Sequence, residues 1–150
     1  MSKETNEASE KVLVEQVIKD CIMWPYPEKN PDRLRGSLAQ DSSFFIYHPD
    51  AASTIRGYDN FEKLIQTVFL SDKLKATGTE ISDLEINIAA SGEVAWFRCI
   101  LQDHGEWEGK AYKWKDCRWT GVLVKRDGKW LIVHAHFSTP SAGQGEGSSV

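Results

Sequence analysis

The segment from Arg118 to Pro140, RWTGVLVKRDGKWLIVHAHFSTP, constrains the fold of this chain more than any other. Two runs of alternating side chains flank Asp127-Gly128, and an Asp-Gly pair between such runs is the strongest short-range signal for a β-hairpin. The two-residue turn needs positive φ at both central positions, which aspartate and glycine tolerate. The segment therefore predicts two long antiparallel strands joined by a tight turn.

Strict alternation assigns the side chains of this hairpin to two faces of a sheet. One face is apolar, and the other mixes apolar residues with arginine, threonine and two histidines. On this reading the mixed face carries Arg118, Thr120, Val122, Val124, Trp130, Ile132, His134, His136 and Ser138. We therefore expect the apolar face to lie in a core or interface and the mixed face to line a polar cavity.

Length and composition predict one globular domain. The chain has 150 residues, of which 41% are hydrophobic and 27% charged, and its formal net charge is −4. This balance gives no general attraction to nucleic acid or to an anionic membrane, and no apolar run reaches the roughly 18 residues of a membrane span. The N-terminus is polar and acidic, unlike a signal peptide. Three scattered cysteines without metal-ligand spacing favour reduced thiols and a cytoplasmic protein.

Three helices and a short strand are predicted before the hairpin. Apolar residues recur at helical spacing over residues 9–22, and prolines then end the helix. Asn30 and Pro31 predict the start of a second helix, with Asn30 as its N-cap. A strand over residues 44–48 follows. A capping box formed by Asp59 and Glu62 predicts a third helix.

From Thr79 onward the period of the apolar pattern changes to two. Long strands are predicted over residues 94–102 and 110–125, with a turn over 105–109 between them. Helices followed by strands indicate an α+β fold, in which helices pack on a curved antiparallel sheet and enclose a pocket. We expect a single domain over residues 9–140 and disordered tails at 1–8 and 141–150.

Three segments carry a resemblance to a known family. The terminal KRDGKWLIVHAHFS, together with YHPDAASTIRGYDNF and GEVAWFRC, resembles the nuclear transport factor two-like superfamily. The similarity is to its SnoaL-like branch, to the association domain of calcium/calmodulin-dependent protein kinase II and, more distantly, to ketosteroid isomerase. The resemblance implies a cone-shaped α+β fold, a pocket between the helices and the sheet, and homodimers packed through sheet surfaces.

His48 is the candidate catalytic residue. It ends the first strand just before Pro49, where the ketosteroid-isomerase-like members of the superfamily place a general-base aspartate. A histidine suits proton transfer because its unperturbed pKa is about 6.5. The alternative is an imidazole that hydrogen-bonds to the backbone at the rim of the pocket.

Arg98 and Trp96 are candidate ligand-binding residues. They share one face of a predicted strand with Val94 and Ile100, and a buried arginine there needs an anionic or carbonyl partner. We expect Arg98 to point into the pocket and Trp96 to form part of its wall. The alternatives for Arg98 are an internal ion pair or an exposed position.

Arg118, Thr120, His134 and His136 complete the predicted ligand-binding set. Thr120 lies near the position of the protonated acid in the isomerases, whereas their tyrosine on the first helix has no counterpart here. Two arginines favour a carboxylate or another anionic ligand. The His-x-His pair places two imidazoles on one face, but no third ligand is evident, so no metal site is predicted.

Two functions remain open on these grounds. The first is a small-molecule pocket protein that binds an anionic or oxygen-rich ligand, working without a cofactor as an isomerase, cyclase or dehydratase with His48 as base. The second is a non-catalytic module that forms homo-oligomers. A surface of aromatic side chains is expected to form the homodimer interface of the sheet: Trp107, Tyr112, Trp114, Trp119 and Phe137.

Overall fold

A computed structural model describes residues 3–141 of the chain. Helices precede the long strands, as the sequence predicts. The elements in chain order are α1 (Lys3–Met23), α2 (Pro31–Gly36), β1 (Phe45–Tyr47), the 3-10 helix η1 (Ala51–Ser53), β2 (Ile55–Arg56), α3 (Tyr58–Leu64), the π-helix η2 (Ile65–Phe69), β3 (Leu74–Ile88), β4 (Val94–Trp107), β5 (Lys110–Arg126) and β6 (Lys129–Ser138).

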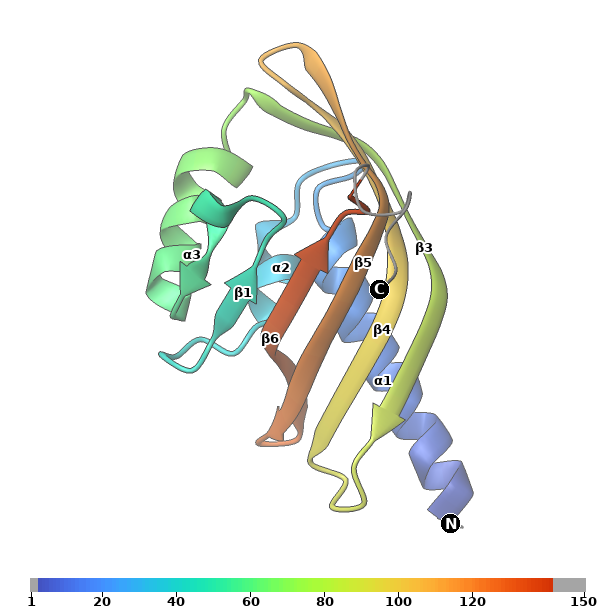
Figure 1. Cartoon of the computed structure of the whole chain (residues 1–150). Coiled ribbons are helices and arrows are strands. Elements are labelled where there is room, and N and C mark those ends of the chain that lie inside the picture. Colours follow the sequence, from blue (N-terminus) through green and yellow to red (C-terminus); the bar gives the residue numbers. More distant parts are fainter. Residues whose placement is uncertain (1–2, 142–150) are drawn as a thin grey trace.

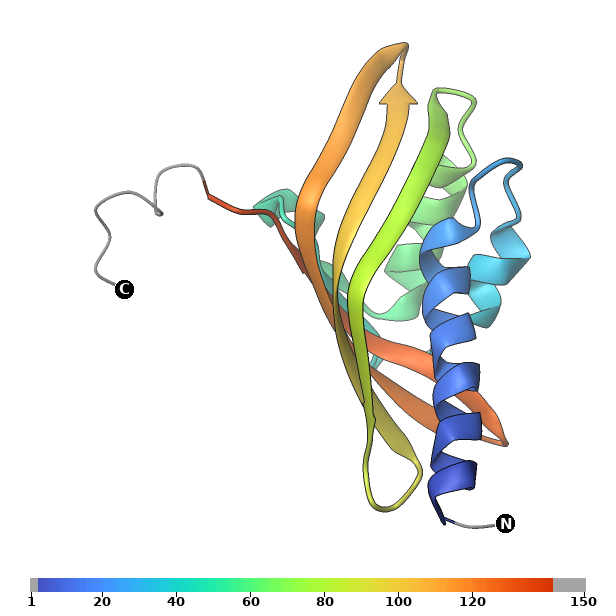
Figure 2. The same ribbon diagram turned by 90° about the vertical axis from the view of Figure 1, so that its right-hand side faces the viewer.

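The six strands form one curved sheet in the order β2-β1-β6-β5-β4-β3. All neighbours are antiparallel except β1 and β6, so the sheet is mixed rather than wholly antiparallel as expected. The three α-helices lie against one side of the sheet, and no element among residues 3–141 covers the other side (Figures 1 and 2). We call the side that meets the helices the inner face and the opposite side the outer face. The α+β prediction is confirmed.

The helix ends agree only in part with their sequence signals. Helix α1 begins at Lys3 rather than near residue 9, because its first two turns are polar and give no apolar period. The cap at Asn30 is confirmed, since its side chain accepts from the backbone N of Arg33 at 3.3 Å. The predicted capping box is wrong: α3 is capped by Gly57, with φ 78°, and Glu62 is engaged elsewhere. None of the described helices has the length and apolar character that a membrane span requires.

The predicted hairpin turn is confirmed. Asp127 and Gly128 have φ values of 51° and 78°, as a two-residue turn of this type needs. The same turn chemistry recurs between β4 and β5, where Glu108 and Gly109 have φ values of 53° and 82°. Strand β4 therefore continues through Trp107, whereas the sequence pattern placed a turn over residues 105–109.

A bulge in β6 changes which of its side chains face inward. Val122 pairs with His134 and Leu123 with Ile132, which leaves Val133 as an extra residue. An extra residue shifts the alternation by one. The side chains of β6 that face inward therefore belong to even-numbered residues up to Ile132 and to odd-numbered residues from Ala135 onward. Ile132 is buried beneath the helices, while His136 is exposed on the other side. The prediction that both share a face is wrong for this reason.

The core lies on the inner face. One uninterrupted apolar stripe of β4 packs beside a second stripe of β5, and α1 covers them: Ala95, Phe97, Cys99 and Leu101; Cys117, Trp119, Gly121 and Leu123; Val14 and Ile18. Gly121 pairs directly with Phe97, whose ring lies over the glycine backbone. A Cβ at Gly121 would lie 2.6 Å from that ring and 2.8 Å from the carbonyl oxygen of His134, so the close packing here requires glycine.

Candidate functional site

A cavity of about 450 Å³ lies between the inner face of the sheet and the helices. This volume falls within the roughly 300 to 1,000 Å³ of small-molecule sites. Its polar side chains are His48, Asp50, Ser53, Asp103 and Tyr112. The rest of the wall is Cys21, Ile22, Trp24, Pro25, Leu34, Ile46, Pro49, Ala52, Ile55, Phe61, Leu64, Val68, Phe69, Leu74, Trp114 and Phe137.

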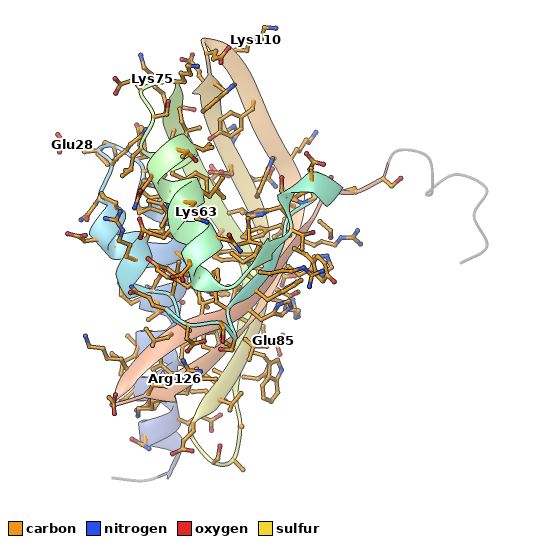
Figure 3. All side chains as sticks on the ribbon, turned by 90° about the vertical axis from the view of Figure 1, so that its left-hand side faces the viewer. Glu28, Lys63, Lys75, Glu85, Lys110 and Arg126 are labelled. Carbon is orange, nitrogen blue, oxygen red and sulfur yellow. The ribbon has the colours of Figure 1, made fainter. Side chains whose placement is uncertain are left out.

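The cavity lies at one end of the sheet. Figure 3 shows Lys75 and Lys110 at that end and Arg126 toward the other. The strand residues that line the cavity, among them Leu74 and Tyr112, are close neighbours of these two lysines in the chain. A second, smaller hollow of about 330 Å³ lies between α1 and the far part of β3, lined by Lys11, Val12, Glu15, Leu84, Glu85 and Ile86.

His48 lines the cavity, as the sequence predicts for a pocket residue at the end of β1. The chain turns directly after this residue, and Asp50 caps η1 by accepting from the backbone N of Ala52 at 3.1 Å. This turn brings the carbonyl of Ser53 to 2.8 Å from Nδ1 of His48. Because a carbonyl oxygen only accepts, Nδ1 carries the proton of this bond, and in the neutral ring Nε2 holds the lone pair.

The imidazole of His48 is held in an aromatic stack. It lies parallel to the Phe137 ring, with centroids 5.4 Å apart and planes 8° apart, and Trp114 is 6.2 Å away. Phe137 in turn stacks on Trp119 at 5.2 Å. Burial lowers the pKa of His48, and its bond to the Ser53 carbonyl opposes this only in part. The ring is therefore a neutral base, fixed in orientation by its neighbours.

Asp103 is the second ionisable group inside the cavity, and sequence reasoning missed it. Its carboxylate accepts from the hydroxyl of Thr79 at 2.8 Å, across the β3–β4 pair. Burial raises the pKa of Asp103, although the Thr79 bond opposes the shift. The pKa of the adjacent Tyr112 rises to about 12, first through burial and then through the charge of Asp103. The sequence did contain a signal for Asp103. By the alternation along β4 it lies on the same face as Phe97, directly after the last apolar residue of that face.

A bulge in β5 sets the neighbours of Asp103. Leu101 pairs with Cys117 and Asp103 with Trp114, so β5 has one residue more than β4 between these pairs. Gln102 satisfies the irregular backbone by accepting from the Asp116 amide at 2.9 Å. The extra residue lets Trp114 and Cys117 face inward although they are three positions apart.

The cavity combines a neutral base with a carboxyl group whose pKa is raised, in largely apolar surroundings. Such a pair of groups can accept and return a proton without a cofactor. Burial raises the pKa of the Cys21 thiol to about 12, so it is not a thiolate nucleophile at neutral pH. None of the described lining residues is a lysine or arginine. Within residues 3–141, no three His, Cys, Asp or Glu side chains are grouped to hold a metal ion.

The six predicted ligand-binding residues come together, but on the outer face. Cross-strand pairing places them in three adjacent rows. The first row is Tyr47, His136, Thr120, Arg98 and Glu85; the second is Phe45, His134, Val122, Trp96 and Asn87; the third is Ser138, Arg118, Ile100 and Ser82. None of the six lines the cavity. Their predicted position in the pocket is therefore corrected, because the more uniformly apolar stripe of each strand faces inward.

Arg98 is paired with protein carboxylates rather than with a cavity. It donates to Asp83 at 3.0 Å and also to Glu85, and its side chain is 53% exposed. Of the two alternatives, the structure shows the exposed position, and the ion pair of Arg98 lies at the surface rather than inside the protein. The expectation that the cavity binds a carboxylate rested on Arg98 and Arg118. Neither residue lines the cavity, so this expectation has no support from them.

Four of the five aromatic residues expected at an interface lie on the inner side instead. Tyr112, Trp114 and Phe137 line the cavity, and Trp119 is fully buried in the core. The exposed aromatic side chains of the outer face are Trp96, 47% exposed, and Tyr47, 45% exposed. The apolar face of the hairpin therefore lies in the core, which is one of the two expected alternatives, and it also lines the cavity, whereas the mixed face forms the outer surface.

Comparison with protein-family models gives one match. The model of the SnoaL-like domain matches residues 14–142. No curated protein sequence matches the chain significantly.

Solved structures of low sequence identity share the fold. A putative calcium/calmodulin-dependent kinase II association domain from Exiguobacterium sibiricum is 10% identical, with a TM-score of 0.71 over 88% of this chain and 94% of that one. A hexachlorocyclohexane dehydrochlorinase, LinA type 2, is 12% identical, with a TM-score of 0.71 over 93% and 90%. A putative association domain of the same kinase type from Xanthomonas campestris is 19% identical, with a TM-score of 0.58 over 95% and 90%.

Proposed function

Because the chain belongs to the SnoaL-like domain family, we propose that it binds a small molecule in its cavity and transfers a proton within it, with His48 as the base. The reaction class is a cofactor-free isomerisation, cyclisation or dehydration. The observation that carries this proposal is the fixed tautomer of His48, whose Nδ1 proton is held by the Ser53 carbonyl at 2.8 Å. A general base needs this combination of an available lone pair and a defined orientation.

The polar groups of the cavity suit an oxygen atom of a ligand. Tyr112 donates a hydrogen bond, Asp103 donates one when protonated, and His48 takes up a proton. An anionic ligand is not part of this proposal, because neither Arg98 nor Arg118 lines the cavity. The structure of LinA supports a lyase reaction on this fold only by analogy, since the identity is 12%.

Proton exchange of a bound ketone tests the role of His48. We expect the protein to accelerate exchange of the α-protons of indanone in deuterated water, followed by proton NMR. Replacing the base should lower this rate about 10²-fold or more in His48→Gln. The matched control is His136→Gln, because His136 lies on the outer face and should leave the rate unchanged. A rate equal in His48→Gln and wild type would refute the proposal.

The second candidate function is homo-oligomerisation through the outer face. The specific observation is the pair of neighbouring rows that expose Trp96 and Tyr47 beside His134 and His136. An exposed aromatic patch of this kind is typical of a protein interface. Association domains such as those from Exiguobacterium sibiricum and Xanthomonas campestris have the same fold, which favours a second copy as the partner.

A charge placed in the patch tests this second function. We expect wild-type protein to form a dimer or larger ring by sedimentation equilibrium, and Trp96→Glu to shift it to monomer. Val12→Glu is the control, because Val12 is an apolar residue 69% exposed on α1, away from the outer face. A monomeric wild-type protein, or an oligomer that Trp96→Glu leaves intact, would remove this function. Catalytic and oligomeric roles are compatible, since they use opposite faces.

A further inference from the structure

We propose that Asp103 makes the cavity select uncharged ring-shaped ligands and exclude anions of the same shape. This inference rests on the proposed function only in that the same cavity binds the ligand. It assigns to Asp103 a role in specificity and leaves the identity of the base to His48. It also reverses the carboxylate preference that the two arginines suggested from sequence.

The charges around the cavity are the first step. Its described lining has two carboxylates, Asp50 and Asp103, and neither lysine nor arginine. The imidazole of His48 is neutral, because burial lowers its pKa. An anion in this cavity therefore meets negative groups without a compensating cation, and desolvating it in such a place is costly.

The two carboxylates differ in how strongly they act on a ligand. Asp50 is exposed at the rim, where water and salt screen its charge. Asp103 is less exposed than Asp50 and lies on β4 between β3 and β5, with the Thr79 hydroxyl as its hydrogen-bond donor. A charge in such low-dielectric surroundings acts over a longer range, so Asp103 dominates the discrimination.

An uncharged ligand avoids this conflict in either protonation state of Asp103. A ligand hydroxyl donates to the carboxylate, and a ligand carbonyl accepts from the carboxylic acid. An anion of the same shape meets repulsion from the carboxylate or requires its protonation, which costs free energy at neutral pH. Specificity of this kind comes from an element that repels the wrong ligand as much as from one that attracts the right one.

The aromatic walls define the shape of the ligand. Trp114 and Phe137 flank His48 on the sheet side, and Trp24 and Phe69 pair on the helix side with centroids 5.7 Å apart. Flat apolar surfaces of this kind favour a ring that can stack on them. The ligand class is therefore a neutral ring compound that carries a hydroxyl or carbonyl group.

A matched ligand pair tests the selectivity. Naphthylmethanol and naphthoate, substituted at the same ring position, have the same size and differ in charge. We expect wild-type protein to bind naphthylmethanol about tenfold or more tightly than naphthoate at neutral pH, measured by isothermal titration calorimetry. Asp103→Asn keeps the shape of the side chain and removes its charge. In that variant the affinity for naphthoate should rise to near that for naphthylmethanol, while the affinity for naphthylmethanol should stay the same.

Asp50→Asn is the control variant, since it removes the other carboxylate and retains the side-chain oxygen that caps η1. We expect it to leave the ratio of the two affinities unchanged. If Asp103→Asn does not fold, Asp103→Ser serves the same purpose. Naphthoate binding as tightly as naphthylmethanol to the wild type, a ratio that no Asp103 variant changes, or failure of both compounds to bind would each overturn the inference.

This outcome is separate from that of the exchange experiment. If the selectivity depends on Asp103 but indanone exchange does not depend on His48, the ligand class stands and the catalytic role falls. If naphthoate binds as well as naphthylmethanol while exchange still requires His48, the base stands and the inference about Asp103 falls.

Discussion

The inner and outer faces of the sheet are built from the same strands but carry different chemistry. On the inner face of β4 the alternating residues from Ala95 to Leu101 are all apolar, and the one ionisable group of the stripe that lines the cavity is Asp103. On the outer face the same strand presents Trp96 and Arg98, both exposed, and Arg98 forms an ion pair with Asp83. The carboxyl group of the cavity therefore comes from the residue that directly follows the apolar inner stripe of β4.

This difference shows what a mixture of apolar and charged residues means on a strand. Trp96 and Arg98 together resemble a polar cavity wall in sequence, but an arginine is far easier to keep at a surface, with Asp83 beside it, than to bury. The purer stripe is the one that the helices cover. Aromatic residues on the mixed stripe therefore indicate an outer surface, and a single carboxylate on the pure stripe indicates the cavity.

The largest effect on stability is expected when a tryptophan of the inner face is replaced, and a tryptophan of the outer face serves for comparison. Trp119 is fully buried between Phe97 and Phe137, so Trp119→Ala should lower the free energy of unfolding by about 3 to 5 kcal/mol. Trp96 is 47% exposed, so Trp96→Ala should cost about 1 kcal/mol or less in the monomer. Urea unfolding at low protein concentration measures both. Equal costs would mean that the assignment of the two faces is wrong.

Much of the fold follows from local sequence signals. The turn at Asp127-Gly128 depends on backbone conformations that few residues tolerate, and the cap at Asn30 depends on a hydrogen bond to a residue nearby in the chain. Both are short-range effects, so the sequence predicts them. The order of helices before strands is also local. The parallel pairing of β1 with β6 is not, because residues 45 and 134 meet only in the folded chain.

The candidate site depended more on tertiary structure. His48 was predicted at the pocket because its position before Pro49 resembles that of the general base in the ketosteroid-isomerase-like members of the superfamily, and it lines the cavity. Asp103 was missed because alternation alone does not say which stripe faces inward. The extra residue Val133 then reversed the faces within β6, so that His134 and His136 were assigned with Ile132. A single bulge is enough to move every later side chain to the other face.

The second prediction compares two glycines in neighbouring regions of the sheet. A Cβ at Gly121 would lie 2.8 Å from the backbone oxygen of His134, which cannot move easily, so Gly121→Ala should cost about 1 to 3 kcal/mol. A Cβ at Gly78 in β3 would meet no atom within 4 Å, and Gly78→Ala should be neutral or slightly stabilising. Thermal and urea unfolding of both variants measure the difference. A tolerated Gly121→Ala would contradict the tight contact between Phe97 and β5.

The smallest effect on stability is expected from an ion pair between helices, which we compare with an ion pair on the outer face. Glu62 accepts from Arg35 through two bonds of 2.9 Å, and Tyr58 donates to it at 2.8 Å. The Arg35 bonds lower the pKa of Glu62 from 4.5 to about 2, and burial opposes them. The folded state therefore binds the proton less readily than the unfolded chain. The contribution of Glu62 is complete above the unfolded pKa and is lost as the pH falls toward the folded one.

Wild-type stability should consequently fall more steeply than that of Glu62→Gln between about pH 6 and about pH 3, by roughly 1 kcal/mol because both side chains are partly exposed. Glu85→Gln is the control, since its partner Arg98 is 53% exposed and such surface pairs contribute little. Urea unfolding across this pH range gives the slopes. Parallel slopes for wild type and Glu62→Gln would show that the α2–α3 ion pair is as weak as the outer one, and that the helix layer is held over the cavity by apolar packing alone.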